Sequence, residues 1–399
     1  MPTAIPLSRP DITQKEIDAV VEVMSTPTLS IGPKLEEFEQ AVARLTNRRH
    51  AIGVSSGTAG LHCCMVAANI GPGDEVITTP FSFVASTNCI LYVGARPVFL
   101  DIDPKSLNID LDKLKEAVTP RTKAIVSVEA FGNPAGMVEL EQFAQQHELV
   151  LIEDSCEGLG GYLRTNWKPP GLLEPGPQGP DLRPIGSFGR ASVFGFYPNK
   201  QITTGEGGMI VTDDDTFAAV CRALRNQGRE GMAWLAHQRL GFNYRLSEIN
   251  AALGVAQMQR LDELLEARRR VAVQYIERLM TSRFVIVPTV MEDCIMSWFV
   301  FVVRLTDLFE PADRDLLMTE LRKAGIGTNN YFPPIHLQPY IANIYGYKEG
   351  DFPLCEFVSA RTIALPFHAR LTELQVDHVV RCLNEQIEKC LMVRKDGTL

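Results

Sequence analysis

One lysine of this chain stands in surroundings that favour covalent chemistry. Lys200 follows the apolar, aromatic run Phe194–Pro198, and the glycine-rich turn Thr203–Gly208 comes after it. Most lysines lie on solvated faces, whereas a half-buried lysine has its ammonium form disfavoured, which makes its amine nucleophilic. Such an amine can form a Schiff base with an aldehyde. On local composition alone, a solvated surface lysine remains the alternative interpretation.

Two carboxylates end the apolar run Leu149–Ile152, which is predicted to be a buried strand. In open α/β sheets, ligands bind beyond the carboxyl ends of the strands, where Asp154 would lie. A carboxylate there can pair with a cation, which in pyridoxal-phosphate (PLP) chemistry is the pyridinium nitrogen of an electron-withdrawing ring. An opposite charge nearby shifts a pKa by about 1–3 units, enough to keep that nitrogen protonated. The alternative is an aspartate that caps the next turn.

A small-residue turn, Ser55–Gly60, follows one predicted strand and opens a helix. The first amides of a helix are unpaired and lie at the positive end of its dipole, so they can hold an anion. Gly57 lets the backbone approach a phosphate closely, and Thr58 adds a hydroxyl. Plain helix capping by the same turn is the alternative interpretation.

These residues need elements that bring them to one edge of a sheet. Helical patterns at Gly57–Ala68, Leu111–Val118 and Leu140–His147 alternate with short apolar runs. The runs are His50–Val54, Glu75–Thr78, Pro97–Asp101, Lys123–Val128, Leu149–Ile152, Ser192–Phe196 and Gly208–Thr212. Such alternation predicts an α/β fold with a mostly parallel sheet covered on both faces.

Two changes in composition divide the chain. Residues 166–185 are rich in proline and glycine without periodicity, which indicates a surface loop or insertion, either a spacer or a lid. A shift near Ser282 predicts a large domain over residues 1–281 and a small one over residues 282–399. Capping boxes at Thr13 with Glu16 and at Thr372 with Gln375 announce the first and last helices.

Bulk composition excludes several classes of protein. The net charge of −9 argues against a nucleic-acid-binding surface, and no apolar run approaches the roughly 20 residues of a membrane span. The nine cysteines contain no C-x-x-C pair, which indicates reduced thiols in a cytoplasmic protein, and no metal site is predicted. The N-terminus lacks the pattern of a secretory signal.

Six stretches together resemble the DegT/DnrJ/EryC1/StrS family of PLP-dependent nucleotide-sugar aminotransferases. They are SSGTAGLH, GDEVITTPFSFVAS, EDSCEGLGG, FYPNKQITTGEGGMIVTDD, LGFNYRLSEINAALG and NNYFPPIHLQPY, and they span nearly the whole chain in the family's order. The resemblance implies PLP fold type I, the aspartate-aminotransferase-like fold, with a seven-stranded large-domain sheet and a smaller α+β C-terminal domain. It also implies PLP as the cofactor.

The resemblance assigns the cofactor site residue by residue. Lys200 is the Schiff-base lysine and proton shuttle, and Asp154 pairs with the pyridinium. Gly57 and Thr58 bind the phosphate, and Phe83 stacks on the ring.

Four further positions follow from the same resemblance. Glu157 stands beside the phenolic oxygen, where the family often has glutamine. Asn243 reaches the phosphate from the partner subunit, which implies a homodimer with shared active sites. Arg245 and His336 lie in motifs near the substrate, with a surface ion pair and a satisfied histidine as the respective alternatives.

The chain departs from the family pattern at Gly195. Many members have a serine five residues before the lysine, and its hydroxyl binds the phosphate. Glycine removes that donor, which is worth about 0.5–1.5 kcal/mol.

The implied reaction moves an amino group from an amino acid, usually glutamate, to the keto group of a nucleotide-linked deoxyhexose through an aldimine on Lys200. Two alternative functions are a sugar dehydratase and a non-catalytic PLP-binding protein. Related sugar dehydratases have histidine where Lys200 stands, so the lysine favours amino transfer. A non-catalytic PLP-binding regulatory protein would not need the complete set of lysine, aspartate and phosphate turn.

Overall fold

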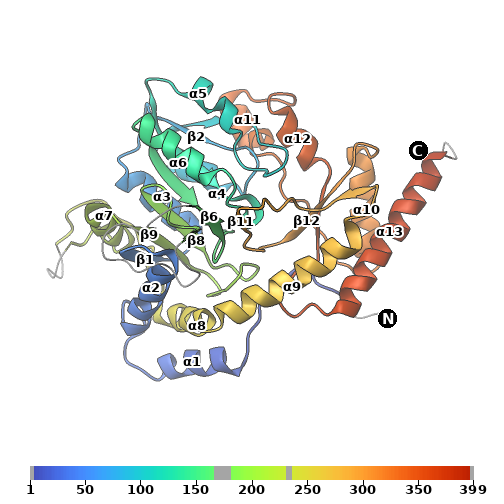
Figure 1. The fold of residues 1–399 in the computed structure, drawn as a ribbon. Coiled ribbons are helices and arrows are strands. Elements are labelled where there is room, and N and C mark those ends of the chain that lie inside the picture. The colour runs from blue at the N-terminus through green and yellow to red at the C-terminus, as the bar shows by residue number, and fades with distance from the viewer. Residues whose placement is uncertain (1–3, 166–180, 231–235, 396–399) are drawn as a thin grey trace.

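The computed structural model describes residues 4–165, 181–230 and 236–395, and a seven-stranded sheet lies at its centre (Figure 1). The strand order is β1 (His50–Val54), β9 (Gly208–Thr212), β8 (Ala191–Gly195), β5 (Val150–Asp154), β4 (Thr122–Val128), β2 (Glu75–Thr78), β3 (Arg96–Phe99). β9 alone runs opposite to the other six strands, so its pairings with β1 and β8 are antiparallel and the other pairings are parallel. The predicted mostly parallel sheet is confirmed.

Helices cover both faces of this sheet. Adjacent residues of β4 and β5 point to opposite faces, and both faces are buried: Val126 and Ile152 lie in one core, Ile125 and Leu151 in another. The first core lies against α3 (Gly57–Ala67), α4 (Ala85–Tyr92) and α7 (Asp215–Arg225), and the second lies against α6 (Met137–Gln146). The carboxyl ends of the parallel strands are therefore fixed from both sides.

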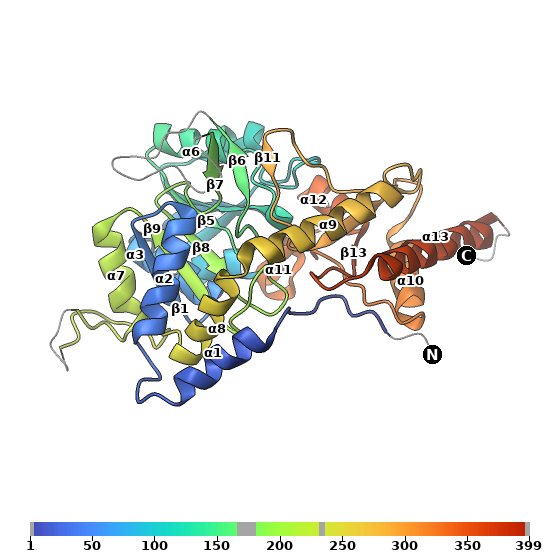
Figure 2. The ribbon, with the colours of Figure 1, turned by 60° about the horizontal axis from the view of Figure 1, so that its bottom comes forward.

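A second sheet lies beyond the first and is joined to it by a long helix. It contains β10 (Val285–Ile286), β12 (Phe301–Leu305) and β13 (Thr362–Leu365) and packs with α10 (Pro311–Lys323) and α13 (Glu373–Lys395). The helix α9 (Leu261–Leu279) runs from the large sheet to the small one in both views (Figure 2). On it, Tyr275 stacks on Phe301 with 4.8 Å between ring centroids.

The predicted domain boundary falls between α9 and β10 and stays a prediction. Elements cross it in both directions: Ile5 belongs to the small-sheet core, and β11 (Cys294–Ile295) pairs with β6 (Tyr162–Arg164) beside the large sheet. No helix among the described residues is long and apolar enough to pass through a lipid bilayer.

Two local predictions need correction. The expected helix Leu111–Val118 is split into a 3₁₀ turn, η1 (Leu111–Lys113), and the short α5 (Leu114–Ala117), and Val118 is already extended. Pro120 restricts the backbone just before it, which leaves too few residues for a longer helix. In the expected loop 166–185, residues Leu182–Pro184 form β7 and pair with β6. Residues 166–180 lie outside the described part of the chain.

The first and last helices begin with the capping boxes that their sequences predict. In front of α1 (Gln14–Met24), the Thr13 N–H donates to Glu16 Oε2 over 2.7 Å, and the Thr372–Gln375 box is formed as well. The helix α2 (Pro33–Thr46) is capped from a distance. Glu248, in the first turn of α8 (Glu248–Met258), accepts the amides of Gly32, Lys34 and Leu35 over 2.8–2.9 Å. The carboxylate of Glu248 therefore holds the start of α2, the helix that precedes β1. Two short helices, α11 (Pro339–Tyr345) and α12 (Pro353–Ser359), complete the C-terminal half.

We expect Glu248→Ala to lower the free energy of unfolding by about 2–4 kcal/mol, because one buried and two partly buried amides lose a charged acceptor. Glu248 is only 1% exposed, so water cannot replace it. Urea unfolding measures the change. Glu36 is an exposed acid in the first turn of α2, and Glu36→Ala should lower the free energy of unfolding by less than about 1 kcal/mol. Equal losses in the two variants would contradict this account.

Candidate active site

Lys200 lies in the turn after β8 with its side chain only 14% exposed. Its Nζ lies 3.7 Å from Glu157 Oε1 and 3.8 Å from the ring centroid of Phe299. The half-buried position expected from the sequence is found, but its surroundings are not apolar alone. The Glu157 carboxylate and the centre of the Phe299 ring both lie within 3.8 Å of the amine.

Asp154 ends β5 on the same edge of the sheet and is 6% exposed. Its Oδ1 accepts the Cys156 N–H over 3.3 Å. Burial raises the pKa of Asp154, while the hydrogen bonds from Cys156 and the charge of Lys200 oppose that rise. A carboxylate in this position is stabilised by any cation that enters the site.

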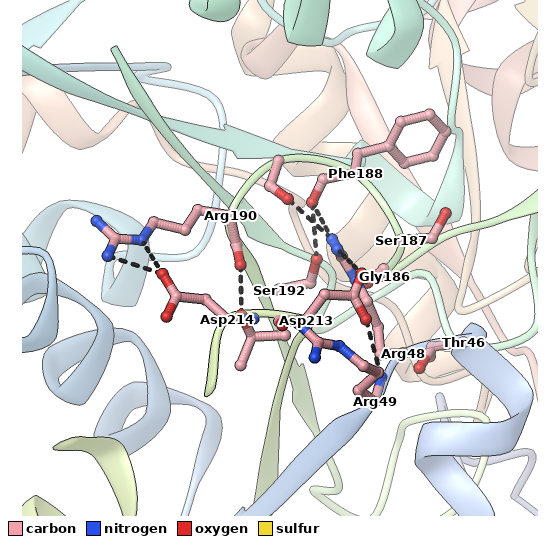
Figure 3. A network of polar contacts seen from close by, with 12 residues as sticks. Thr46, Arg48, Arg49, Gly186, Ser187, Phe188, Arg190, Ser192, Asp213 and Asp214 are labelled. Carbon is pink, nitrogen blue, oxygen red and sulfur yellow. Dashed lines mark hydrogen bonds and ion pairs between the residues drawn. The ribbon is translucent and has the colours of Figure 1, made fainter. Parts of the chain in front are cut away.

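Glu153, the neighbour of Asp154, is fully buried on the opposite face of β5 and holds a turn in place. It accepts the amides of Gly186 and Phe188 over 2.7 and 3.1 Å, and the hydroxyl of Ser192. Figure 3 shows Arg48 on the other side of this turn, donating to the carbonyl oxygens of Gly186 and Phe188 over 2.9 and 2.6 Å. The turn between β7 and β8 is therefore held through its amides by Glu153 and through its carbonyl oxygens by Arg48.

Glu129, just beyond β4, is a fully buried acid for which no hydrogen-bond partner is found among the described residues. Burial raises the pKa of Glu129 well above its usual value, and the nearby Glu153 carboxylate adds to the rise. Because Glu153 already accepts three donors, it is the better anion of the two. Glu129 is therefore the neutral member of this pair.

The turn Ser55–Gly60 opens the helix α3, as the sequence predicts, and is called the cradle below. The Ser56 side chain accepts the Ala59 N–H over 3.1 Å, and its carbonyl accepts the Gly60 N–H over 3.0 Å. Capping is thus real, yet it uses only two of the first four amides of the helix. The amides of Gly57 and Thr58 have no carbonyl behind them in α3 and can hold an anion.

The end of β8 packs directly against this cradle. A Cβ added to Gly57 would lie 2.7 Å from Cys156 Sγ, and one added to Gly195 would lie 3.3 Å from the same atom. A side chain at position 195 would be tightly packed, because its Cβ would lie closer to the Cys156 thiol than ordinary van der Waals contact. That thiol donates to the Val193 carbonyl over 3.6 Å, away from the cradle.

Two other predicted residues present exposed side chains. Phe83, just before α4, is 62% exposed, so its ring has a free face. Asn243 is also exposed, and its backbone pairs with Asn226. The neighbouring Tyr244 carbonyl accepts the Ser55 N–H over 2.8 Å, which places this segment beside the cradle of its own chain.

The two substrate-side candidates are engaged within the protein. Arg245 Nη1 donates to Asn226 Oδ1 over 3.0 Å, rather than forming the alternative surface ion pair. His336 is fully buried, with Nε2 3.0 Å from Glu356 Oε1 and its ring on Phe352. Burial lowers the pKa of His336, and Glu356 opposes this shift. A contact from this histidine to a substrate stays a prediction.

Sequence reasoning missed the residues that hold Lys200 from α9 and from the segment just before β12. Arg268 of α9, 4% exposed, donates to the carbonyl of Lys200 over 2.6 Å and to that of Phe299 over 3.1 Å. Burial lowers the pKa of Arg268 to about 10. Tyr331 lies nearby with its ring stacked on Phe299. Nothing in the sequence marks these residues: Arg268 is the first of three consecutive arginines, and the two aromatic residues lie far along the chain from Lys200.

Comparison with known proteins shows the family to which the chain belongs. A sequence model of the DegT/DnrJ/EryC1/StrS aminotransferase family matches residues 10–384. The GDP-perosamine synthase of Caulobacter vibrioides is 37% identical, covering 96% of this chain and 98% of that protein. The spore coat polysaccharide biosynthesis protein SpsC of Bacillus subtilis is 35% identical, covering 96% and 97%. The structure of Helicobacter pylori PseC, an aminotransferase involved in pseudoaminic acid biosynthesis, has a TM-score of 0.88 at 26% identity, covering 97% of this chain and 100% of that one.

We expect Arg268→Lys to lower the free energy of unfolding by about 2–4 kcal/mol, since an ammonium cannot reach two carbonyls as the planar guanidinium does. Denaturant unfolding provides the measurement. Arg269→Lys, next along α9 in an exposed pair with Glu266, should change stability by less than about 0.5 kcal/mol. If Arg268→Lys were equally harmless, the two carbonyl contacts would not matter.

Glu129 should make the protein less stable as pH rises. The unfolded chain loses this proton near the ordinary pKa of 4.5, whereas the folded chain keeps it, so folding binds a proton above that pH. The unfolding free energy of the wild type should therefore fall relative to Glu129→Gln, by at most about 1.4 kcal/mol per pH unit, until the folded-state pKa is passed.

Denaturant unfolding at pH values from about 5 to about 8, above the ordinary pKa of a glutamate, measures this difference. Glu116→Gln, an exposed acid on α5, serves as the control and should follow the wild type. Parallel curves for wild type and Glu129→Gln would show that Glu129 holds no extra proton.

Proposed function

Because the chain belongs to the DegT/DnrJ/EryC1/StrS family of PLP-dependent sugar aminotransferases, we propose that it transfers an amino group from an amino acid, with L-glutamate as donor, to the keto group of a nucleotide-linked deoxyhexose. The observation that carries the proposal is the buried amine of Lys200, set between Glu157 and the Phe299 ring at the edge where Asp154 ends its strand. The relative that synthesises GDP-perosamine supports a sugar attached to a nucleotide.

The residues present fit PLP in their donor set. Asp154 is a buried carboxylate whose raised pKa calls for a cation, as the pyridinium nitrogen would be. The amides of Gly57 and Thr58 are open to a phosphate, and Gly57 has no side chain because Cys156 and Gly195 approach it closely. Phe83 offers an exposed aromatic face to a ring.

Each residue then has a task in the proposed reaction. When bound, PLP takes up the electron pair left by the broken Cα–H bond. Lys200 anchors the cofactor covalently and, once freed by the amino acid, carries the Cα proton through Nζ. Asp154 keeps the ring nitrogen protonated, and Glu157 lies beside the phenolic oxygen.

A second subunit completes the proposed site. Asn243 of one chain would reach the cofactor phosphate of the other in a homodimer, and its exposed side chain leaves it available for that contact. Arg245 and His336 are proposed on the substrate side.

We expect the purified protein to be yellow and borohydride to fix PLP on the Lys200 peptide, as mass spectrometry would detect. Lys200→Ala should lose amino transfer, because neither the anchor nor the proton carrier is left. Lys123→Ala, a lysine with an exposed side chain, should keep colour and activity. A colourless Lys200→Ala variant that still converts substrate would end the proposal.

Initial-rate kinetics with labelled glutamate and a panel of nucleotide-linked keto-sugars identify the substrates. The two half-reactions should give parallel lines in double-reciprocal plots. Intersecting lines, or amino transfer only to sugars without a nucleotide, would contradict the proposed reaction.

A further inference from the structure

Glu157 is held by one carboxylate oxygen and faces Lys200 with the other. Its Oε2 accepts the Phe131 N–H over 2.8 Å, and its Oε1 lies 3.7 Å from Lys200 Nζ. The two side chains are 6% and 14% exposed, so water screens their charges little. The carboxylate is therefore directed at the amine.

The backbone turn that anchors Glu157 is itself rigid. Phe131 has a left-handed backbone with φ 59° and ψ 20°, which is costly for a residue with a side chain. The preceding Ala130 N–H donates to Asn108 Oδ1 over 2.9 Å, and a Cβ on the following Gly132 would lie 1.8 Å from the Ser297 carbonyl. The strained turn is kept in a position where the Phe131 N–H points at Glu157.

The charged and titratable groups around Glu157 come from three segments. Burial raises the pKa of Glu157, Lys200 and the Phe131 N–H lower it, and Asp154 raises it again. Burial and the charge of Glu157 together raise the pKa of Tyr331, and they act likewise on the thiol of Cys156, which Asp154 raises further. Lys200 is the one cation among these groups, so each charge of the pair stabilises the other.

We propose that Glu157 is the counter-ion of protonated Lys200 and acts as a catalytic residue by stabilising the ammonium that forms when Lys200 takes the substrate proton. This rests on the proposed function. In that step the substrate Cα–H bond would break, bound PLP would take up the electron pair, and the proton would form a new N–H bond at Lys200 Nζ. A glutamine at position 157 could still accept the Phe131 N–H but would carry no charge.

Competitive acetylation of the cofactor-free protein tests the charge of Glu157 without catalysis. Only the neutral amine reacts with acetic anhydride, so labelling of the Lys200 peptide against pH reports when the ammonium disappears. In Glu157→Gln, half-labelling should occur about 1–3 pH units lower than in the wild type, because the ammonium has lost its opposite charge. An unchanged midpoint would overturn the proposal.

Two further variants separate charge from shape. Glu157→Asp keeps the charge and should label with a midpoint nearer the wild type than Glu157→Gln does. Glu266→Gln removes one negative charge from an exposed pair on α9 and should leave Lys200 labelling unchanged. If Glu157→Asp shifted as far as Glu157→Gln, charge would not be the cause and the proposal would fail. Thermal unfolding of each variant confirms that the compared proteins are folded.

Failure of this inference is distinguishable from failure of the proposed function. If borohydride fixes PLP on Lys200 of the wild type while Glu157→Gln leaves the labelling midpoint unchanged, only the role of Glu157 is lost. If the wild type takes up no PLP on Lys200, the proposed function is lost, and the role assigned to Glu157 falls with it.

Discussion

Four carboxyl groups are buried around the ends of two neighbouring strands, and each must find compensation there. Leaving such a group both charged and unpaired would cost several kcal/mol, so their surroundings are tightly constrained. The backbone amides of the turn at residues 186–188 serve one, the turn at Phe131 serves another, and a third keeps its proton. The groups are Glu129, Glu153, Asp154 and Glu157. Asp154 accepts one long hydrogen bond, from the Cys156 N–H over 3.3 Å, and it is the carboxylate proposed to pair with the cofactor.

Lys200, beside these carboxyl groups, is held by α9 and by the segment just before β12. Arg268 bonds the carbonyls of Lys200 and Phe299, and Phe299 lies under the amine. Because α9 carries Arg268 on one turn and Tyr275 of the small-sheet core two turns later, the position of Lys200 depends on how that sheet packs. The position of Lys200 is thus set partly by residues that follow it by 68 to 99 positions in the sequence.

How much of this could be predicted depends on the distance over which each residue acts. Lys200, Asp154 and the phosphate turn are recognisable because their surroundings, a strand end, a proline and nearby glycines, are neighbours in the sequence. Strand β7 was missed because its three residues have no periodicity and form only by pairing with β6. Arg268, Phe299 and the capping of α2 by Glu248 were missed for the same reason. Nothing local distinguishes a buried arginine or glutamate from an exposed one before the chain is folded.

The close approach of Gly57, Cys156 and Gly195 has a consequence for how this part of the sequence can change. The three positions share one small volume, and the thiol occupies the part that a serine hydroxymethyl at position 195 would need. A serine at position 195 would therefore be accommodated best beside a smaller residue at position 156, so we expect these two positions to vary together with roughly constant summed volume.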